Sequence, residues 1–232
     1  MAKVKLDEMF PDEVRTALKA RPLAYLPIGQ LERHGPHCAI GLDGLKAYEL
    51  CLRCAERTGG VVVPPTYWSV GEWVSDETVG DLEPETIEAL YYQIFRGLKQ
   101  LGARAIVALT GHYPQNQVQT LSDAAKRASV DQDVAILALG ENELTQDMGY
   151  LKDHAGRWET SLLMYLRPKL VDMGRLAPYD ISTQEGQRAA RVWDPETKEA
   201  SSPELGQRVA EIIVERLSAK ALGLLQENAG KG

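Results

Sequence analysis

Short apolar runs alternate with helix-patterned segments along almost the whole chain, and this alternation limits the possible folds more than any other feature. The apolar runs cover residues 23–28, 61–65, 105–110 and 134–139. Helical spacing covers residues 43–57, 85–101, 115–128, 158–166 and 203–225. Strands that alternate with helices at this spacing indicate a mostly parallel sheet covered on both faces. We therefore expect an α/β fold.

Length and charge narrow the class of protein further. A chain of 232 residues with this pattern is expected to form a single domain spanning residues 1–232. The formal net charge of −7 argues against a nucleic acid or an anionic membrane surface as the partner. No apolar run approaches the ~18 residues of a transmembrane helix, and the charged N-terminus lacks the apolar centre of a signal peptide. We expect a cytoplasmic protein that binds a small molecule.

The four histidines are the most informative residues for function. His34 and His37 follow the first apolar run, His112 follows the third, and His154 follows a segment that we expect to be a later strand. The carboxyl ends of parallel strands meet at one edge of a sheet, where ligands bind. The spacing therefore predicts that these histidines converge on one crevice.

Two carboxylates accompany these histidines. Glu32 precedes His34 by two residues, and Asp43 lies at the start of the following helix, from which its side chain can turn back to the same place. Imidazole together with carboxylates suits zinc, manganese or iron. Taken singly, Asp43 would be a helix N-cap and His37 a residue that orients its loop. Together the set predicts a two-metal hydrolytic site in which one Asp bridges the ions.

Aromatic side chains near these histidines are candidates for binding substrate. Trp73 and Trp158 are expected either to form the walls of a small pocket or to pack in the core, which is the more common place for tryptophan. Tyr113 directly follows His112 and is a further candidate for shaping the pocket.

Four segments, taken together, resemble the creatininase (creatinine amidohydrolase) family. They are residues 26–37 with Asp43 beyond them, residues 82–86 before a long helix, residues 110–116, and residues 154–161. The resemblance implies a three-layer α/β/α sandwich with a mostly parallel central sheet. It also implies a cytoplasmic homo-oligomer, commonly a hexamer, that hydrolyses C–N bonds in small, often cyclic amides.

The resemblance also implies roles for individual residues. Glu32, His34, Asp43 and His112 fall on the metal-ligand positions of the family, with Asp43 as the bridge between two divalent ions. His154 falls on the position of the catalytic histidine. Asp153 precedes it, where an acidic residue is often found.

The chain departs from the family pattern at one metal-ligand position. Creatininases place a metal-binding Glu two residues after the histidine that corresponds to His112, whereas this chain has Pro114, which offers no ligand atom. If two metal ions bind, another carboxylate has to supply the bond. Glu159 is the best candidate.

The expected mechanism is attack by a metal-activated hydroxide on a carbonyl carbon, with His154 donating a proton to the leaving group and Asp153 orienting its ring. Two alternatives stay open. The same attack on a carbonyl would serve a C–C hydrolase that opens a cyclic diketone such as an inositol-derived keto sugar. The chain could also be a non-catalytic protein that binds metal or a small molecule.

Overall fold

The computed structural model describes residues 3–71, 78–79, 82–130, 133–150 and 153–229. The strands are β1 (Leu23–Ile28), β2 (Val61–Val62), β3 (Ala105–Thr110) and β4 (Ala135–Gly140). The helices are α1 (Pro11–Ala20), α2 (Leu42–Thr58), α3 (Pro84–Leu101), α4 (Gln115–Ala128), α5 (Arg157–Leu166), α6 (Gln184–Ala190), α7 (Thr197–Ala200) and α8 (Pro203–Ala229). Short 3₁₀ turns lie at Leu6–Glu8, Glu141–Leu144, Gln146–Met148, Pro168–Leu170 and Met173–Arg175.

The described strands form one parallel sheet in the order β2-β1-β3-β4. β1 pairs with β3 over six residues, from Leu23 opposite Ala105 to Ile28 opposite Thr110. β3 pairs with β4 in the same way, and Thr110 lies opposite Gly140. The three longer strands therefore end at the same level, so the loops that follow them leave from one edge of the sheet.

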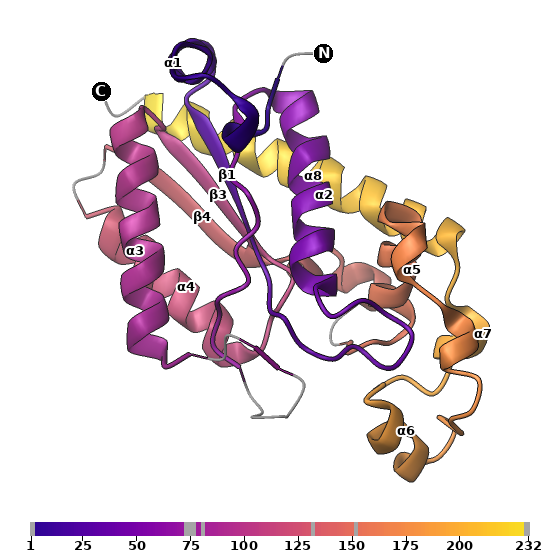
Figure 1. The fold of residues 1–232 in the computed structure, drawn as a ribbon. Helices are drawn as coiled ribbons and strands as arrows, with labels where there is room; N and C mark the ends of the chain where they lie inside the picture. Colours follow the sequence, from indigo (N-terminus) through magenta and orange to yellow (C-terminus); the bar gives the residue numbers. More distant parts are fainter. Residues whose placement is uncertain (1–2, 72–77, 80–81, 131–132, 151–152, 230–232) are drawn as a thin grey trace.

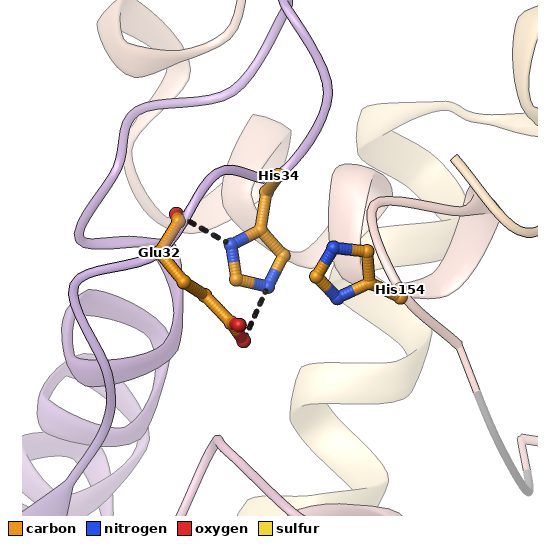
Figure 2. Close-up of side chains that lie close together, drawn as sticks. All are labelled: Glu32, His34 and His154. Carbon is orange, nitrogen blue, oxygen red and sulfur yellow. Dashed lines mark hydrogen bonds and ion pairs between the residues drawn. The ribbon is translucent and has the colours of Figure 1, made fainter. Parts of the chain in front are cut away.

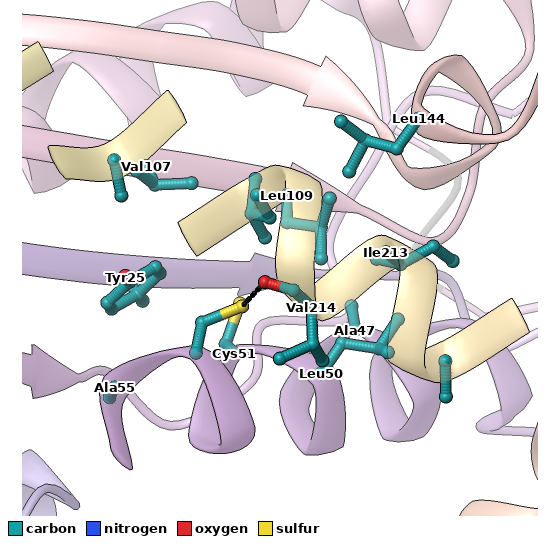
Figure 3. Packing of buried hydrophobic residues seen from close by; sticks show 14 of the residues in the cluster. Tyr25, Ala47, Leu50, Cys51, Ala55, Val107, Leu109, Leu144, Ile213 and Val214 are labelled. Carbon is teal, nitrogen blue, oxygen red and sulfur yellow. Dashed lines mark hydrogen bonds between the residues drawn. The ribbon is translucent and has the colours of Figure 1, made fainter. Parts of the chain in front are cut away.

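Helices cover both faces of this sheet, with α3 and α4 on one side and α2 and α8 on the other (Figure 1). Successive side chains of a strand point to opposite faces. Accordingly, Leu23 and Tyr25 of β1 join the cluster under α2, α5 and α8, whereas Ala24 and Leu26 join the cluster under α1, α3 and α4. Figure 3 shows the first of these two cores. The α/β fold and the three-layer arrangement with a parallel sheet are thus confirmed.

The element predictions hold closely for the sheet and its covering helices, and one prediction is wrong. His154 does not follow a strand: β4 ends at Gly140, and among the described residues the chain from there to α5 contains only 3₁₀ turns and loop. Leu144 and Tyr150 of this segment pack into the core under α2, α5 and α8. The short helix α1 lies outside the segments that were predicted to be helical.

The polar segment 172–198 forms a lobe that carries α6 and α7 and lies beside α5 (Figure 1). Its apolar side chains pack around Ala155, which belongs to the segment containing His154. The lobe therefore supports one side of the candidate site. None of the described helices is long and apolar enough to cross a membrane.

Candidate metal centre

Glu32, His34 and Asp43 are brought together by the close packing of β1 against the start of α2. A Cβ atom at Gly29, directly after β1, would lie 2.0 Å from the backbone nitrogen of Gly44. Only glycine allows this approach. It places Asp43, in the first turn of α2, beneath the loop that carries Glu32 and His34.

His112 reaches the same place from the end of β3. A Cβ atom at Gly111 would lie 2.3 Å from the carbonyl oxygen of Asp43, so this strand end also packs directly on α2. His112 Nε2 lies 3.2 Å from the carbonyl oxygen of Val70. A carbonyl only accepts hydrogen bonds, so Nε2 carries a proton. His112 Nδ1 therefore faces the carboxylates, 2.9 Å from Glu32 Oε1 and 3.3 Å from Asp43 Oδ2.

A backbone carbonyl also orients the imidazole of His34, but it bonds Nδ1 of that ring and not Nε2. Its Nδ1 donates to the backbone carbonyl oxygen of Glu32 at 3.2 Å. This leaves Nε2 facing three carboxylates: Asp43 Oδ1 at 3.2 Å, Glu159 Oε2 at 3.6 Å and Glu32 Oε1 at 3.8 Å. Figure 2 shows the Glu32 carboxylate beside this nitrogen, with the ring of His154 next to that of His34.

Three overlapping groups of these side chains have ligand atoms close enough to share a metal ion. Within each group, the atoms all lie within 4.8 Å of one another in the described structure; the groups are Glu32–Asp43–His112, His34–Asp43–Glu159 and Glu32–His34–His154. The first two groups share Asp43. Each contains one histidine and a carboxylate of its own, which is the arrangement expected of two ions bridged by one Asp.

The Asp43 carboxylate itself provides the test of whether a metal fits. Both of its oxygens are completely buried, and neither has a hydrogen bond of acceptable geometry within the described chain. One oxygen faces His34 Nε2 and the other faces His112 Nδ1. A buried carboxylate without hydrogen bonds is unfavourable unless a cation compensates it. The donor set of carboxylates and imidazoles therefore fits divalent ions such as zinc or manganese, and the metal prediction is confirmed.

The carboxylates of the cluster raise the pKa values of its two central histidines. Burial opposes protonation of His34, but the Asp43 and Glu159 carboxylates outweigh it and raise its pKa to about 10. Burial likewise opposes protonation of His112, but the neighbouring Asp43 and Glu32 carboxylates raise its pKa to about 10. Without metal, therefore, both imidazoles carry protons at neutral pH, in places where a metal would otherwise be held.

His154 lies at the edge of this cluster, on the side of the 172–198 lobe. Its ring centre is 4.5 Å from that of His34, and its Nε2 lies 3.0 Å from the carbonyl oxygen of Arg33. Burial and the positive charge of His34 lower the pKa of His154, although nearby carboxylates oppose them. Because the Arg33 carbonyl fixes the proton on Nε2, Nδ1 is left as a proton acceptor.

Asp153 accepts hydrogen bonds from the backbone at the start of the neighbouring helix, α5. One oxygen of its carboxylate accepts the N–H groups of Trp158 and Glu159, at 2.8 and 2.9 Å, at the start of α5. A Cβ atom at Gly156 would lie 1.7 Å from the other oxygen, so glycine is required for this cap. The role of Asp153 beside the ring of His154 stays a prediction.

Tyr113 and Trp158, two of the three aromatic candidates for substrate binding, contact other residues of the protein. The Tyr113 hydroxyl donates to Glu159 Oε1 at 2.9 Å and also lies 3.1 Å from the hydroxyl of Tyr150. The ring of Trp158 stacks on that of Tyr150, with centroids 5.6 Å apart and planes 9° apart. Trp73 lies outside the described residues. Substrate binding by these three residues stays a prediction.

His37 lies behind the cluster, as its position in the loop suggested. Its Nε2 is 2.9 Å from the hydroxyl of Thr160 on α5, and burial together with His34 lowers its pKa to about 4. It belongs to none of the candidate metal groups among the described residues. A neutral His37 therefore ties the metal-site loop to α5.

Three residues in or beside the site had not been expected from the sequence. Lys46 of α2 and Glu141, directly after β4, are both completely buried and form an ion pair beside Glu159. Glu141 follows a strand end, as His112 does, and that position was the available signal. Trp193 of the lobe donates its backbone N–H to the carbonyl oxygen of His154 at 3.0 Å, and half of its side chain is exposed.

Comparison with known proteins agrees with this description. A creatinine amidohydrolase from Pseudomonas putida is 27% identical, with the match covering 83% of this chain and 86% of that protein. A zinc–zinc form of a creatininase variant has a TM-score of 0.78 at 26% identity, over 94% of this chain and 97% of that chain. A structure described as creatininase with Mn has a TM-score of 0.78 at 25% identity, with the same coverage.

The fold and the site together define a metal-dependent α/β hydrolase whose carboxylates and histidines gather at the carboxyl edge of a parallel sheet. The family model for creatininase, described as creatinine amidohydrolase, matches residues 7–221. The chain therefore belongs to the creatininase family. The predicted resemblance and the predicted class, a metal-dependent amidohydrolase, are confirmed.

Proposed function

We propose that the protein is a two-metal hydrolase that cleaves the C–N bond of a small cyclic amide. The observation that carries the proposal is the pair of donor groups sharing Asp43, one with Glu32 and His112 and the other with His34 and Glu159. The creatinine amidohydrolase from Pseudomonas putida supports this class of substrate. In this proposal Glu159 supplies the carboxylate that Pro114 does not.

The first group would hold one ion and the second group the other, with Asp43 between them. When bound, such ions supply a nucleophilic water at neutral pH and an electrophile for the carbonyl oxygen. The chain itself contributes the placement of the ligands: Asp43 is held by the packing of two strand ends on α2, and the two histidines are held by backbone carbonyls.

His154 is proposed to move the proton. Its Nε2–H is held by the carbonyl oxygen of Arg33, which leaves the lone pair of Nδ1 free at the edge of the cluster. In this role Nδ1 takes a proton from the attacking water and delivers it to the leaving nitrogen. Because His154 also belongs to one of the three candidate metal groups, its role has to be separated experimentally from that of a ligand.

Two features of the protein beyond its chemistry are also proposed. The family resemblance suggests a cytoplasmic homo-oligomer, commonly a hexamer. Sedimentation and native mass measurements would determine the oligomer directly.

The proposal is tested by removing metal, reloading with zinc or manganese, and measuring turnover of creatinine, other cyclic amides and cyclic diketones. Wild type is compared with Asp43→Asn and with Asp123→Asn, a matched change on the exposed side of α4. We expect about two metal equivalents and amide turnover in wild type and in Asp123→Asn, and loss of at least one equivalent in Asp43→Asn.

Other outcomes point to other functions. Turnover of diketones alone would replace the amidase with a C–C hydrolase. Metal binding with no turnover of any carbonyl substrate would favour a binding protein. Failure of the wild type to bind metal would overturn the proposal.

A further inference from the structure

Lys46 is a completely buried lysine at the base of the candidate metal centre. It lies on α2 one turn after Asp43, and its ammonium nitrogen is 2.5 Å from Glu159 Oε1 and 2.7 Å from Glu141 Oε1. The same nitrogen is 3.8 Å from Asp43 Oδ1. Lysine is almost never fully buried unless it is paired. The ion pairs therefore explain how this side chain is tolerated here, but not what it contributes.

The two oxygens of Glu159 have different surroundings, and Lys46 creates the difference. Oε1 receives the Lys46 ammonium and the hydroxyl of Tyr113, at 2.5 and 2.9 Å. Oε2 accepts the N–H of Ala155 at 2.8 Å and faces His34 Nε2 at 3.6 Å. Donors on both sides thus fix the carboxylate plane, and only Oε2 is presented to the rest of the cluster.

The backbone contributes to the same arrangement. Ala155 has a backbone φ of +54°, in the left-handed region that residues other than glycine rarely adopt. This conformation accompanies the hydrogen bond from its N–H to Glu159 Oε2. Lys46 on one side and the N–H of Ala155 on the other therefore fix the orientation of the Glu159 carboxylate.

The charge of Lys46 could in principle oppose metal binding, because an ammonium repels divalent cations. However, Glu141 neutralises it: the Lys46–Glu141 pair carries no net charge, and the Tyr150 hydroxyl donates to Glu141 Oε1 at 2.9 Å. We therefore expect Lys46 to act on the site mainly through the position of Glu159. Carboxylate ligands are held in place by such outer partners, whose loss typically weakens metal affinity 10–100-fold.

We propose that Lys46 is a positioning residue for the second metal site: it holds Glu159 so that one oxygen is directed toward His34 and Asp43. The inference rests on the proposed two-metal function and adds to it a protein cation on which one of the two sites depends. Among the ion pairs of the described residues, Lys46 joins the site formed by Glu32, Asp43 and His112 only through the shared Asp43.

The test compares metal binding in wild type, Lys46→Met and the double variant Lys46→Met/Glu141→Gln, which removes both charges of the Lys46–Glu141 pair. Thr58→Val is the matched control, because Thr58 is buried on the same helix and bonds Tyr25 rather than the site. Dissociation constants for each zinc equivalent are measured by competition with a chromophoric chelator. The visible absorption of bound Co²⁺ reports the ligand geometry, and thermal unfolding without metal reports folding.

We expect one equivalent to bind 10–100-fold more weakly in both Lys46 variants, with an altered Co²⁺ spectrum for that equivalent only. The other equivalent and the Thr58→Val control should match wild type. Tyr113→Phe, which removes the second donor to Glu159 Oε1 and keeps every charge, should weaken the same equivalent by a smaller factor. It serves as the test if the Lys46 variants do not fold.

Two results would overturn the inference while leaving the proposed function in place. The first is a folded double variant that binds both equivalents with wild-type constants and spectra. The second is tighter binding of one equivalent, since repulsion by the ammonium would then be the larger effect. Fewer than two equivalents in wild type would instead refute the two-metal function itself, and the inference with it.

Discussion

Metal binding to this protein should displace protons, and the number displaced follows from the structure. His34 and His112 both have a pKa of about 10 in the absence of metal, because carboxylates surround them. Each is the only histidine in one of the two groups that share Asp43. Metal ligands have to be deprotonated, so each ion that binds should release one proton from its own histidine.

The magnitude can be stated for both affinity and proton count. Below the pKa of the two histidines, each apparent association constant should rise about tenfold per pH unit, which is about 1.4 kcal/mol. Affinity therefore increases as the pH rises, because fewer imidazoles hold a proton that must leave. At pH 6 both imidazoles are protonated, and loading two zinc ions should release about two protons.

Titration calorimetry at pH 6 in buffers of different ionisation enthalpy measures this release directly. At that pH, water bound to zinc, with a pKa near ~7, contributes little. His34→Gln should reduce the release from about two protons to about one, and also weaken one equivalent. A release near zero in wild type would refute protonated histidines in the metal-free site. An unchanged release in His34→Gln would show that His34 is not a ligand.

Two further predictions follow from the segment around α5. His154→Ala should lower turnover by about 10²–10⁴-fold, the range for general acid–base groups, with both metal equivalents retained; loss of an equivalent in elemental analysis would make His154 a ligand. Burial opposes ionisation of Asp194, but hydrogen bonds from Arg157 and the N–H of Glu196 lower its pKa. Its stabilisation is therefore present above the ordinary carboxyl pKa and lost as the pH falls through the lowered value. Asp194→Asn should reduce the free energy of unfolding by about 1–2 kcal/mol at pH 7 and by less as the pH falls below the ordinary carboxyl pKa. A loss in denaturant unfolding that does not shrink with falling pH would contradict this.

The sequence by itself determined the layers of the fold and predicted most of the candidate metal ligands that the structure brings together. Uninterrupted apolar runs fix buried strands, and helical spacing fixes the segments that cover them, because both periods are local properties of the chain. β1 and β3 were therefore predicted residue for residue. Parallel strands share one carboxyl edge, so residues after their ends, such as Glu32 and His112, could be assigned to one site before the structure was known.

The tertiary structure decided what no local pattern contains. Lys46 and Glu159 are 113 residues apart, and their contact depends on how α2 and α5 pack over the end of the sheet. The sequence also did not show that the Asp153 carboxylate accepts the unsatisfied N–H groups at the start of α5. His154 reaches the site from a loop that, in the part of the chain that the structure describes, follows 3₁₀ turns and not a strand. Periodicity specifies which face of an element is buried, but only packing brings side chains from separate elements within bonding distance.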